Sequence, residues 1–326
     1  MKSFKHINTA TVEEAVRILN DYNGRAGIIA GGTDIIGVLK DQILPDSPEA
    51  LVNIKTISGL DQITEGPEGL RIGSLVKLTD LVSSPLIKDK YKVLAEAAQT
   101  IGTPQIRNMG TVGGNLGQDT RCWYYRYPHS IGGRVSCLRK GSGPCLAVAG
   151  DNRYHAILGG KGCFAVCPSD LAVALAALDA VVHIAGAGGN RVVSIQAFFN
   201  PLGNILAPEE IIVEIQIPNP PENSFQQFLK FTVRKPVDFA IVSTAVLVAI
   251  DNGVCSDSRV VLGAVAPGPV RAVGAEQHLK GKKLDAAALR EAAELALEGA
   301  KPLSRNGYKV EITKTLVNRA LLGCIT

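Results

Sequence analysis

No apolar run in this 326-residue sequence is long enough to cross a bilayer. The longest charge-free apolar stretch, residues 239–250, falls well short of the roughly 20 residues that a spanning helix needs. The N-terminus also lacks the apolar core of a secretory signal, because acidic residues begin at Glu13. We therefore expect no membrane contact and a cytoplasmic location by default, although a partner's signal can export a folded complex.

Runs of basic charge are also missing. Lys and Arg total 34 against 30 Asp and Glu, and the basic residues are scattered along the chain, so nothing favours nucleic-acid binding. We find no Ser-His-Asp set, no HExxH and no GxSxG, which argues against a hydrolase. The glycine signatures of nicotinamide-binding and P-loop proteins are absent as well.

The chain is long enough for two domains, and the first part alternates helix and strand patterns. Thr11 and Glu14 form a capping box, followed by apolar residues at the spacing of one helical face. A strand at 26–30, a glycine turn and a helix start at 35–40 follow. Later come a strand at 70–75, a helical face between 91 and 101, and a helix running into a strand from 168 to 186.

A different pattern begins after the proline-rich segment 218–221. Strands are predicted at 225–233, 239–250 and 259–265, and Asp251-Asn252-Gly253 is a strong hairpin signal between the last two. Helices are predicted at 270–279 and 285–299. Strands followed by helices indicate a separate α+β domain.

Two glycine-rich segments, residues 28–36 and 110–117, are candidates for binding a phosphate. Paired glycines allow the backbone to approach a ligand closely and expose successive N–H groups, and a helix start adds its dipole in the first segment. Two structural turns without a ligand remain the alternative for each segment taken alone.

Taken together, five motifs in order resemble a known family. They are AGGTD at 30–34, TVGGN at 111–115, PSD at 168–170, PEEII at 208–212 with a following IP, and FLKFTVRKPVDFAIV at 228–242. Their order is similar to that of the FAD-binding subunit of the molybdenum hydroxylases, the xanthine dehydrogenase and carbon monoxide dehydrogenase family. The resemblance implies an α+β fold, with a two-lobed FAD-binding domain at 1–219 and a small α+β domain at 220–326.

The resemblance also implies roles for individual residues. The first turn would lie against the FAD pyrophosphate, the second would form another cradle, and Ser169 and Asp170 would contact ribityl or adenosine hydroxyls. Ile212 would pack on the flavin ring, and Lys230 would lie near its pyrimidine end, unless it is a solvated lysine on a strand edge. The implied FAD-binding residues are Ile29, Ala30, Gly31, Gly32, Thr33, Asp34, Thr111, Gly113, Gly114, Asn115, Ser169, Asp170, Ile212 and Lys230.

Five of the seven cysteines lie between Cys122 and Cys167, four of them in a segment of about 118–166 that the family otherwise spans with a short link. Thiolates are soft ligands that suit an iron–sulfur cluster or zinc. The spacing contains no C-x-x-C pair and argues against a common zinc ribbon without excluding one.

This insertion resembles the [4Fe-4S] segment of 4-hydroxybenzoyl-CoA reductase and of bacterial aldehyde oxidoreductases. The shared features are TRC at 120–122, RYHAILG at 153–159 and a last cysteine shortly before PSD. The resemblance implies four ligands, which we assign to Cys122, Cys137, Cys145 and Cys163. Cys167 is left out, although it remains the alternative to Cys163. His155 is expected to be structural.

The implied function is electron relay, with no catalytic residue on this chain. A molybdopterin-binding large subunit would act on an aldehyde, an aromatic acyl-CoA or an N-heterocycle, and a [2Fe-2S] small subunit would connect it to the FAD. The [4Fe-4S] cluster would exchange electrons with a ferredoxin or similar carrier. A free-standing flavin oxidoreductase and a zinc-stapled interaction module are the alternatives.

Overall fold

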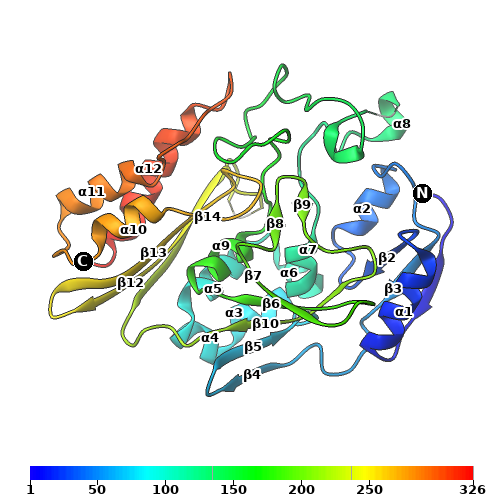
Figure 1. Ribbon diagram of the computed structural model, residues 1–326, viewed down its shortest axis with the longest axis horizontal. Helices are drawn as coiled ribbons and strands as arrows, with labels where there is room; N and C mark the ends of the chain where they lie inside the picture. The colour runs from blue at the N-terminus through cyan, green and yellow to red at the C-terminus, as the bar shows by residue number, and fades with distance from the viewer. Residues whose placement is uncertain (134, 236, 326) are drawn as a thin grey trace.

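The computed structural model describes residues 1–133, 135–235 and 237–325 (Figure 1). Pro236, which belongs to the fifth motif, therefore lies outside the described residues. The chain forms an N-terminal lobe with a three-stranded sheet, a second lobe with a five-stranded sheet, and a C-terminal part with a four-stranded sheet. No helix in the described ranges is both long and apolar enough to cross a membrane.

The N-terminal lobe is a small parallel sheet with the strand order β1-β3-β2. Its elements are β1 (Lys5–Asn8), α1 (Val12–Tyr22), β2 (Ala26–Ile29), α2 (Ile35–Lys40) and β3 (Ala50–Asn53). The Thr11 hydroxyl accepts a hydrogen bond from the Glu14 N–H, so the predicted start of α1 is confirmed. The predicted strand, glycine turn and helix at 26–40 are confirmed as β2, the turn and α2.

The second lobe has an antiparallel sheet in the order β4-β5-β10-β6-β7. Its strands are β4 (Ile63–Gly66), β5 (Gly69–Gly73), β6 (Val181–Ala185), β7 (Arg191–Ser194) and β10 (Ile211–Ile217), with a short pair β8 (Phe199–Asn200) and β9 (Gly203–Asn204). Its helices are α3 (Leu78–Ser83), α4 (Pro85–Lys90), α5 (Lys92–Gln99), α6 (Pro104–Met109), α7 (Val112–Gly117) and α9 (Asp170–Ala177). Every residue of α9 is buried, as expected of a helix that is apolar on nearly all sides.

The C-terminal part has the antiparallel order β11-β12-β13-β14, with helices on one face of the sheet (Figure 1). Its elements are β11 (Phe225–Phe231), β12 (Val242–Asp251), β13 (Val254–Gly263), β14 (Val270–Arg271), α10 (Val273–Leu279), α11 (Ala286–Leu295) and α12 (Tyr308–Leu322). Asn252 and Gly253 have φ of 49° and 80°, so the predicted hairpin turn is confirmed, while β13 begins earlier than predicted. The opposite face contributes Phe228, Ala245 and Leu247 to the core that it shares with α5 and α9.

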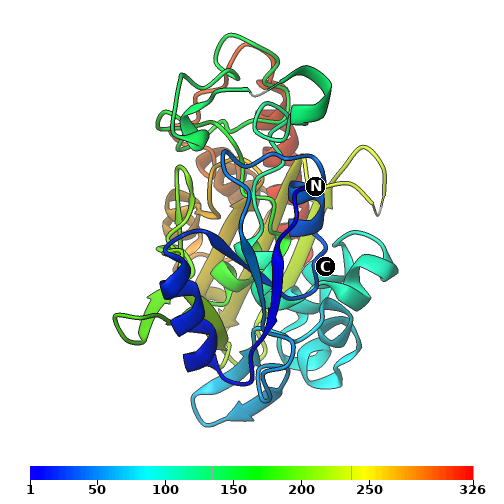
Figure 2. The same ribbon diagram turned by 90° about the vertical axis from the view of Figure 1, so that its right-hand side faces the viewer.

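Residues 118–166 have little regular structure, only α8 (His129–Gly132) and the 3₁₀ turn η1 (Leu138–Lys140) among those described. The segment lies at one end of the molecule, beside the loop that precedes α12 (Figure 2). Backbone hydrogen bonds join Ile157 to Val265 (2.8 Å) and Lys301 to Ile157 (2.7 Å). Backbone hydrogen bonds to the C-terminal part therefore help to hold the segment 118–166, which has little regular structure among its described residues.

Candidate functional site

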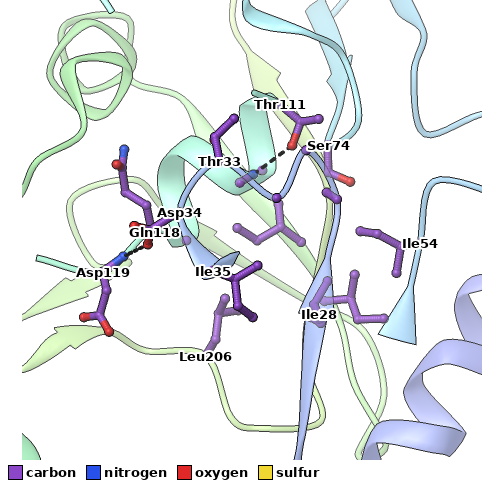
Figure 3. Close-up of a pocket in the computed structure, with 18 of the residues that line it drawn as sticks. Ile28, Thr33, Asp34, Ile35, Ile54, Ser74, Thr111, Gln118, Asp119 and Leu206 are labelled. Atoms are coloured by element: carbon purple, nitrogen blue, oxygen red, sulfur yellow. Dashed lines mark hydrogen bonds between the residues drawn. The ribbon is translucent and has the colours of Figure 1, made fainter. Parts of the chain in front are cut away.

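Two cavities adjoin where the two glycine motifs meet. The first has a volume of about 280 Å³, and the second has about 320 Å³. Both are lined by Thr33, Asp34, Thr111, Gly114 and Gln118, so these residues form the boundary between them. Figure 3 shows the first cavity, with Thr33 and Thr111 beside each other and Ile28, Ile54 and Leu206 on its apolar side. The volumes and the mixed lining are typical of a small-molecule site.

The first glycine turn, residues 31–34, passes directly against the end of α6. A Cβ atom at Gly31 would collide with the carbonyl oxygen of Met109, and Gly32 has φ of +73°. The backbone N–H groups of residues 31–34 donate to no acceptor in the part of the chain that the structure describes. Four successive unused donors beside a cavity form a site for an anion such as a phosphate.

The second glycine turn differs from the prediction, because it forms helix α7. Its N–H groups are used internally, since Gly113 donates to the Ser74 carbonyl (2.8 Å) and Gly114 to the Thr111 hydroxyl (3.1 Å). The expectation that this segment exposes successive N–H donors is therefore wrong. A Cβ atom at Gly113 would lie 2.8 Å from the Ser74 Cβ, so this glycine instead permits close packing of α7 on the end of β5.

Ser74 lines the first cavity and was not recognised from the sequence. Its side-chain oxygen is buried, and it has no hydrogen-bond partner among the described residues. A buried hydroxyl without a partner is costly unless a ligand supplies one. Ser74 is therefore a further candidate contact for a bound group, and only its position after β5 distinguishes it in the sequence.

Residues 119–126 contact the first glycine turn through Asp34. Arg126 and Arg121 approach the Asp34 carboxylate at 2.7 and 3.0 Å, and the Asp119 N–H donates to it at 2.9 Å. Burial lowers the pKa of Arg121 to about 10, so its guanidinium remains charged at neutral pH. Asp34 therefore anchors the turn to the insertion, and its charge is balanced within the protein.

Polar residues of two motifs meet in the second cavity. Asp170 and Lys230 form an ion pair of 2.7 Å, with side chains only 6% and 5% exposed, and the Lys230 ammonium also donates to the Thr100 carbonyl (2.9 Å). Burial raises the pKa of Asp170, while the charge of Lys230 and its hydrogen bond lower it. Lys230 is thus a paired, buried cation, and the alternative of a solvated lysine on a strand edge is wrong.

The other predicted residues differ in where they lie relative to the two cavities. Ile212 lines the first cavity and Lys230 the adjoining second one, so the two residues lie on either side of the boundary between them. The Ile29 and Ser169 side chains line neither cavity; Ile28 lines the first instead. Ser169 caps α9 and donates a hydrogen bond to the Asn115 side chain (2.6 Å). It therefore fixes the position of Asn115, which lines the second cavity.

Breaking the buried pair is expected to destabilise the protein. Lys230→Met leaves the Asp170 carboxylate buried without a partner and should lower the free energy of unfolding by about 3–5 kcal/mol. Urea denaturation of the flavin-free chain measures this loss. The double variant Asp170→Asn/Lys230→Met removes both charges and should recover most of it; equal instability of the single and double variants would contradict the argument.

Four cysteines converge on a third cavity inside the insertion. Cys122, Cys137, Cys145 and Cys163 line it together with Arg139. They are separated by irregular chain, and none of the chain's cysteines is in a disulfide. The structure therefore brings together the four cysteines that the resemblance implies as ligands.

Cys167 lies outside the four-cysteine cavity. It is absent from the lining of that cavity and belongs to the core beside α9. Burial raises the pKa of Cys167 to about 12, but burial also raises the pKa of Cys122, which lines the cavity, so the pKa does not separate a ligand from a bystander. Cys163 is the better ligand candidate because it lines the four-cysteine cavity and Cys167 does not.

Among the described residues, no group of three His, Cys, Asp or Glu side chains is placed to hold a single metal ion. The four thiols share a cavity without forming such a group.

Comparison with known proteins agrees with the two-part fold. Residues 2–220 match the model of the FAD binding domain in molybdopterin dehydrogenase, and residues 227–324 match the CO dehydrogenase flavoprotein C-terminal domain. The FAD-binding subunit PaoB of an Escherichia coli aldehyde oxidoreductase is 36% identical over 290 residues, covering 86% of each chain. The carbon monoxide dehydrogenase medium chain of Hydrogenophaga pseudoflava is 28% identical over 325 residues, covering 98% of this chain and 96% of that one.

A solved structure of the carbon monoxide dehydrogenase from Hydrogenophaga pseudoflava superimposes with a TM-score of 0.78 at 28% identity, covering 98% of this chain and 96% of its counterpart. The matched family model alone spans more than half of the sequence and contains both glycine motifs. The chain therefore belongs to the FAD-binding medium subunits of the molybdenum hydroxylase family and is an oxidoreductase subunit.

Proposed function

We propose that FAD extends across both cavities, with its pyrophosphate at the turn formed by residues 31–34. The unused N–H donors of that turn and the unpartnered Ser74 hydroxyl support this placement, because both would face the phosphates. In this placement the adenine would occupy the first cavity, which puts Ile212 at the adenosine end of FAD. The second cavity, with Lys230, suits the isoalloxazine ring.

The residues of this chain would bind and orient the flavin and take no part in bond making. Lys230 would keep a positive charge near the ring, although Asp170 offsets it, so its effect on the flavin potential would be smaller than that of a free cation. Asn115, held by Ser169, would present its amide to the ribityl hydroxyls. When bound, FAD supplies the ability to interconvert two-electron and one-electron transfer.

We further propose a [4Fe-4S] cluster bound by Cys122, Cys137, Cys145 and Cys163. One observation carries this proposal, the convergence of these four thiols on one cavity within a segment of otherwise irregular chain. Arg139 lines the same cavity with its side chain only 10% exposed, and its charge would offset that of a four-thiolate cluster.

The resulting function is electron relay within a heterotrimeric molybdenum hydroxylase. A molybdopterin-binding large subunit would act on the substrate, a [2Fe-2S] small subunit would connect it to the FAD, and the [4Fe-4S] cluster would exchange electrons with a ferredoxin or similar carrier. Relatives are named for aldehyde, carbon monoxide and xanthine oxidation, which gives the range of substrates for the partner subunit. We place the domain boundary at residues 219–220, and the complex in the cytoplasm.

The composition of the purified full-length chain tests this function. We expect flavin absorbance, one FAD and about four irons per chain, and no substrate oxidation until the large subunit is added. A colourless protein that contains zinc would support the interaction module instead. Substrate oxidation by the isolated chain would support a free-standing flavin enzyme.

A further inference from the structure

His155 lies buried against one of the four clustered cysteines. Only 3% of His155 is exposed to solvent, and its Nε2 atom lies 3.2 Å from the Cys122 Sγ. The rings of Trp123 and Tyr124 lie 5.6 and 6.0 Å from the imidazole, between centroids. An apolar aromatic surrounding of this kind strengthens a polar contact, because water does not compete for it.

The C-terminal part of the chain fixes the position of this histidine. The His155 carbonyl oxygen accepts hydrogen bonds from the Lys309 ammonium and the Asn306 amide, both at 3.1 Å. Lys309 also donates to the Ala264 carbonyl (2.5 Å), and both Lys309 and Asn306 are fully buried. Two rigid donors at the start of α12 therefore hold the backbone of a residue that contacts the cysteine cavity.

The contact with Cys122 has a definite direction. Nδ1 of His155 is buried without a partner among the described residues, so Nε2 is the ring atom engaged in hydrogen bonding. A thiolate bound to a metal has lone pairs and no proton, so it can only accept. The proton of the imidazole must therefore lie on Nε2 when Cys122 is a ligand.

We propose that His155 is a positioning residue whose Nε2–H donates to the Cys122 thiolate and thereby raises the reduction potential of the [4Fe-4S] cluster. The proposal rests on the proposed cluster. The reduced cluster carries one more negative charge than the oxidised cluster, so a donor to its sulfur stabilises the reduced form more. Because α12 holds His155, the C-terminal part would set the potential of a cluster to which it contributes no ligand.

The test compares two variants of the full-length chain by iron content and by redox titration followed by electron paramagnetic resonance. His155→Leu removes the donor and should keep its iron. At any fixed potential its ratio of reduced to oxidised cluster should fall about tenfold, which is a 59 mV lower midpoint for one electron. His155→Gln retains an N–H near the Nε2 position and should return most of the shift, while His183→Leu, in β6, should show none.

The outcomes separate this inference from the proposed function. Wild-type protein without iron would overturn the proposed function itself. An unchanged midpoint in iron-loaded His155→Leu would overturn the role of His155 alone, and loss of iron in both His155 variants would make it a ligand instead. Wild-type protein labelled with ¹⁵N-histidine needs no variant: a nitrogen coupling too weak for direct ligation is expected on the reduced cluster, and its absence would also overturn the role.

Discussion

Replacing Cys163 with serine is expected to reduce the iron content from about four per chain to nearly zero, whereas Cys167→Ser should leave it unchanged. A cube bound by three thiolates exposes one iron to water and is readily lost on purification. Cys163 lines the four-cysteine cavity, and Cys167 does not. Iron and acid-labile sulfide, each measured per chain after gel filtration, give the comparison.

The flavin provides an internal control for this pair of variants. FAD should remain bound in Cys163→Ser, because the glycine turn at 31–34 and the cysteine cavity are separate sites joined through Asp34, Arg121 and Arg126. Retention of flavin with loss of iron would show that the chain is folded. If Cys167→Ser lost iron and Cys163→Ser kept it, the ligand assignment would have to be exchanged.

The fold could be predicted where local signals and tertiary packing agree. The capping box at Thr11, the apolar helix after Ser169 and the Asn252-Gly253 turn each correspond to an element in the structure. Helix α7 could not be predicted, because its sequence VGGNLG has three glycines, which favour turns over helices. It forms because Thr111 caps it and because its glycines allow it to pack on Ser74.

Helix α12 was missed for a different reason. Its apolar positions are interrupted by buried polar residues, Lys309 and Thr313, which hide the helical pattern of the sequence. Both are satisfied by tertiary or backbone carbonyls, those of His155 and Ala264 for Lys309 and that of Lys309 for Thr313. The sequence around Lys309 does not predict its partners, because they lie in segments 45 and 154 positions away.

The residues of the candidate site also divide into those that local sequence patterns identify and those that depend on tertiary contacts. Motifs identified the glycine turns and the four cysteines, because close backbone approach and thiol chemistry need those residue types. They did not identify Ser74, or the pairing of Asp34 with two arginines of the insertion, because both depend on where the chain folds back. Motifs placed Ile212 and Lys230 in the binding site, but which side of the boundary between the two adjoining cavities each one lines depends on the fold.

Gly31→Ala is expected to weaken FAD binding by about 10- to 100-fold. The added Cβ would overlap the Met109 carbonyl oxygen, which is main chain at the end of α6 and cannot rotate away as a side chain would. The turn at 31–34 must therefore move off α6, which shifts its N–H donors relative to the neighbouring cavity. Overpacking of this kind costs about 1–3 kcal/mol, and the expected loss of affinity corresponds to most of that energy.

Gly66→Ala is the matched control for that variant. Gly66 lies at the end of β4, and a Cβ atom there meets nothing within 4 Å, so FAD affinity should be unchanged. Titration of the flavin-free chains with FAD, followed by quenching of flavin fluorescence, gives both dissociation constants. Since overpacking at Gly31 also lowers stability, thermal unfolding of each flavin-free variant is measured alongside. If Gly31→Ala bound FAD as tightly as Gly66→Ala, the pyrophosphate would have to lie elsewhere than at this turn.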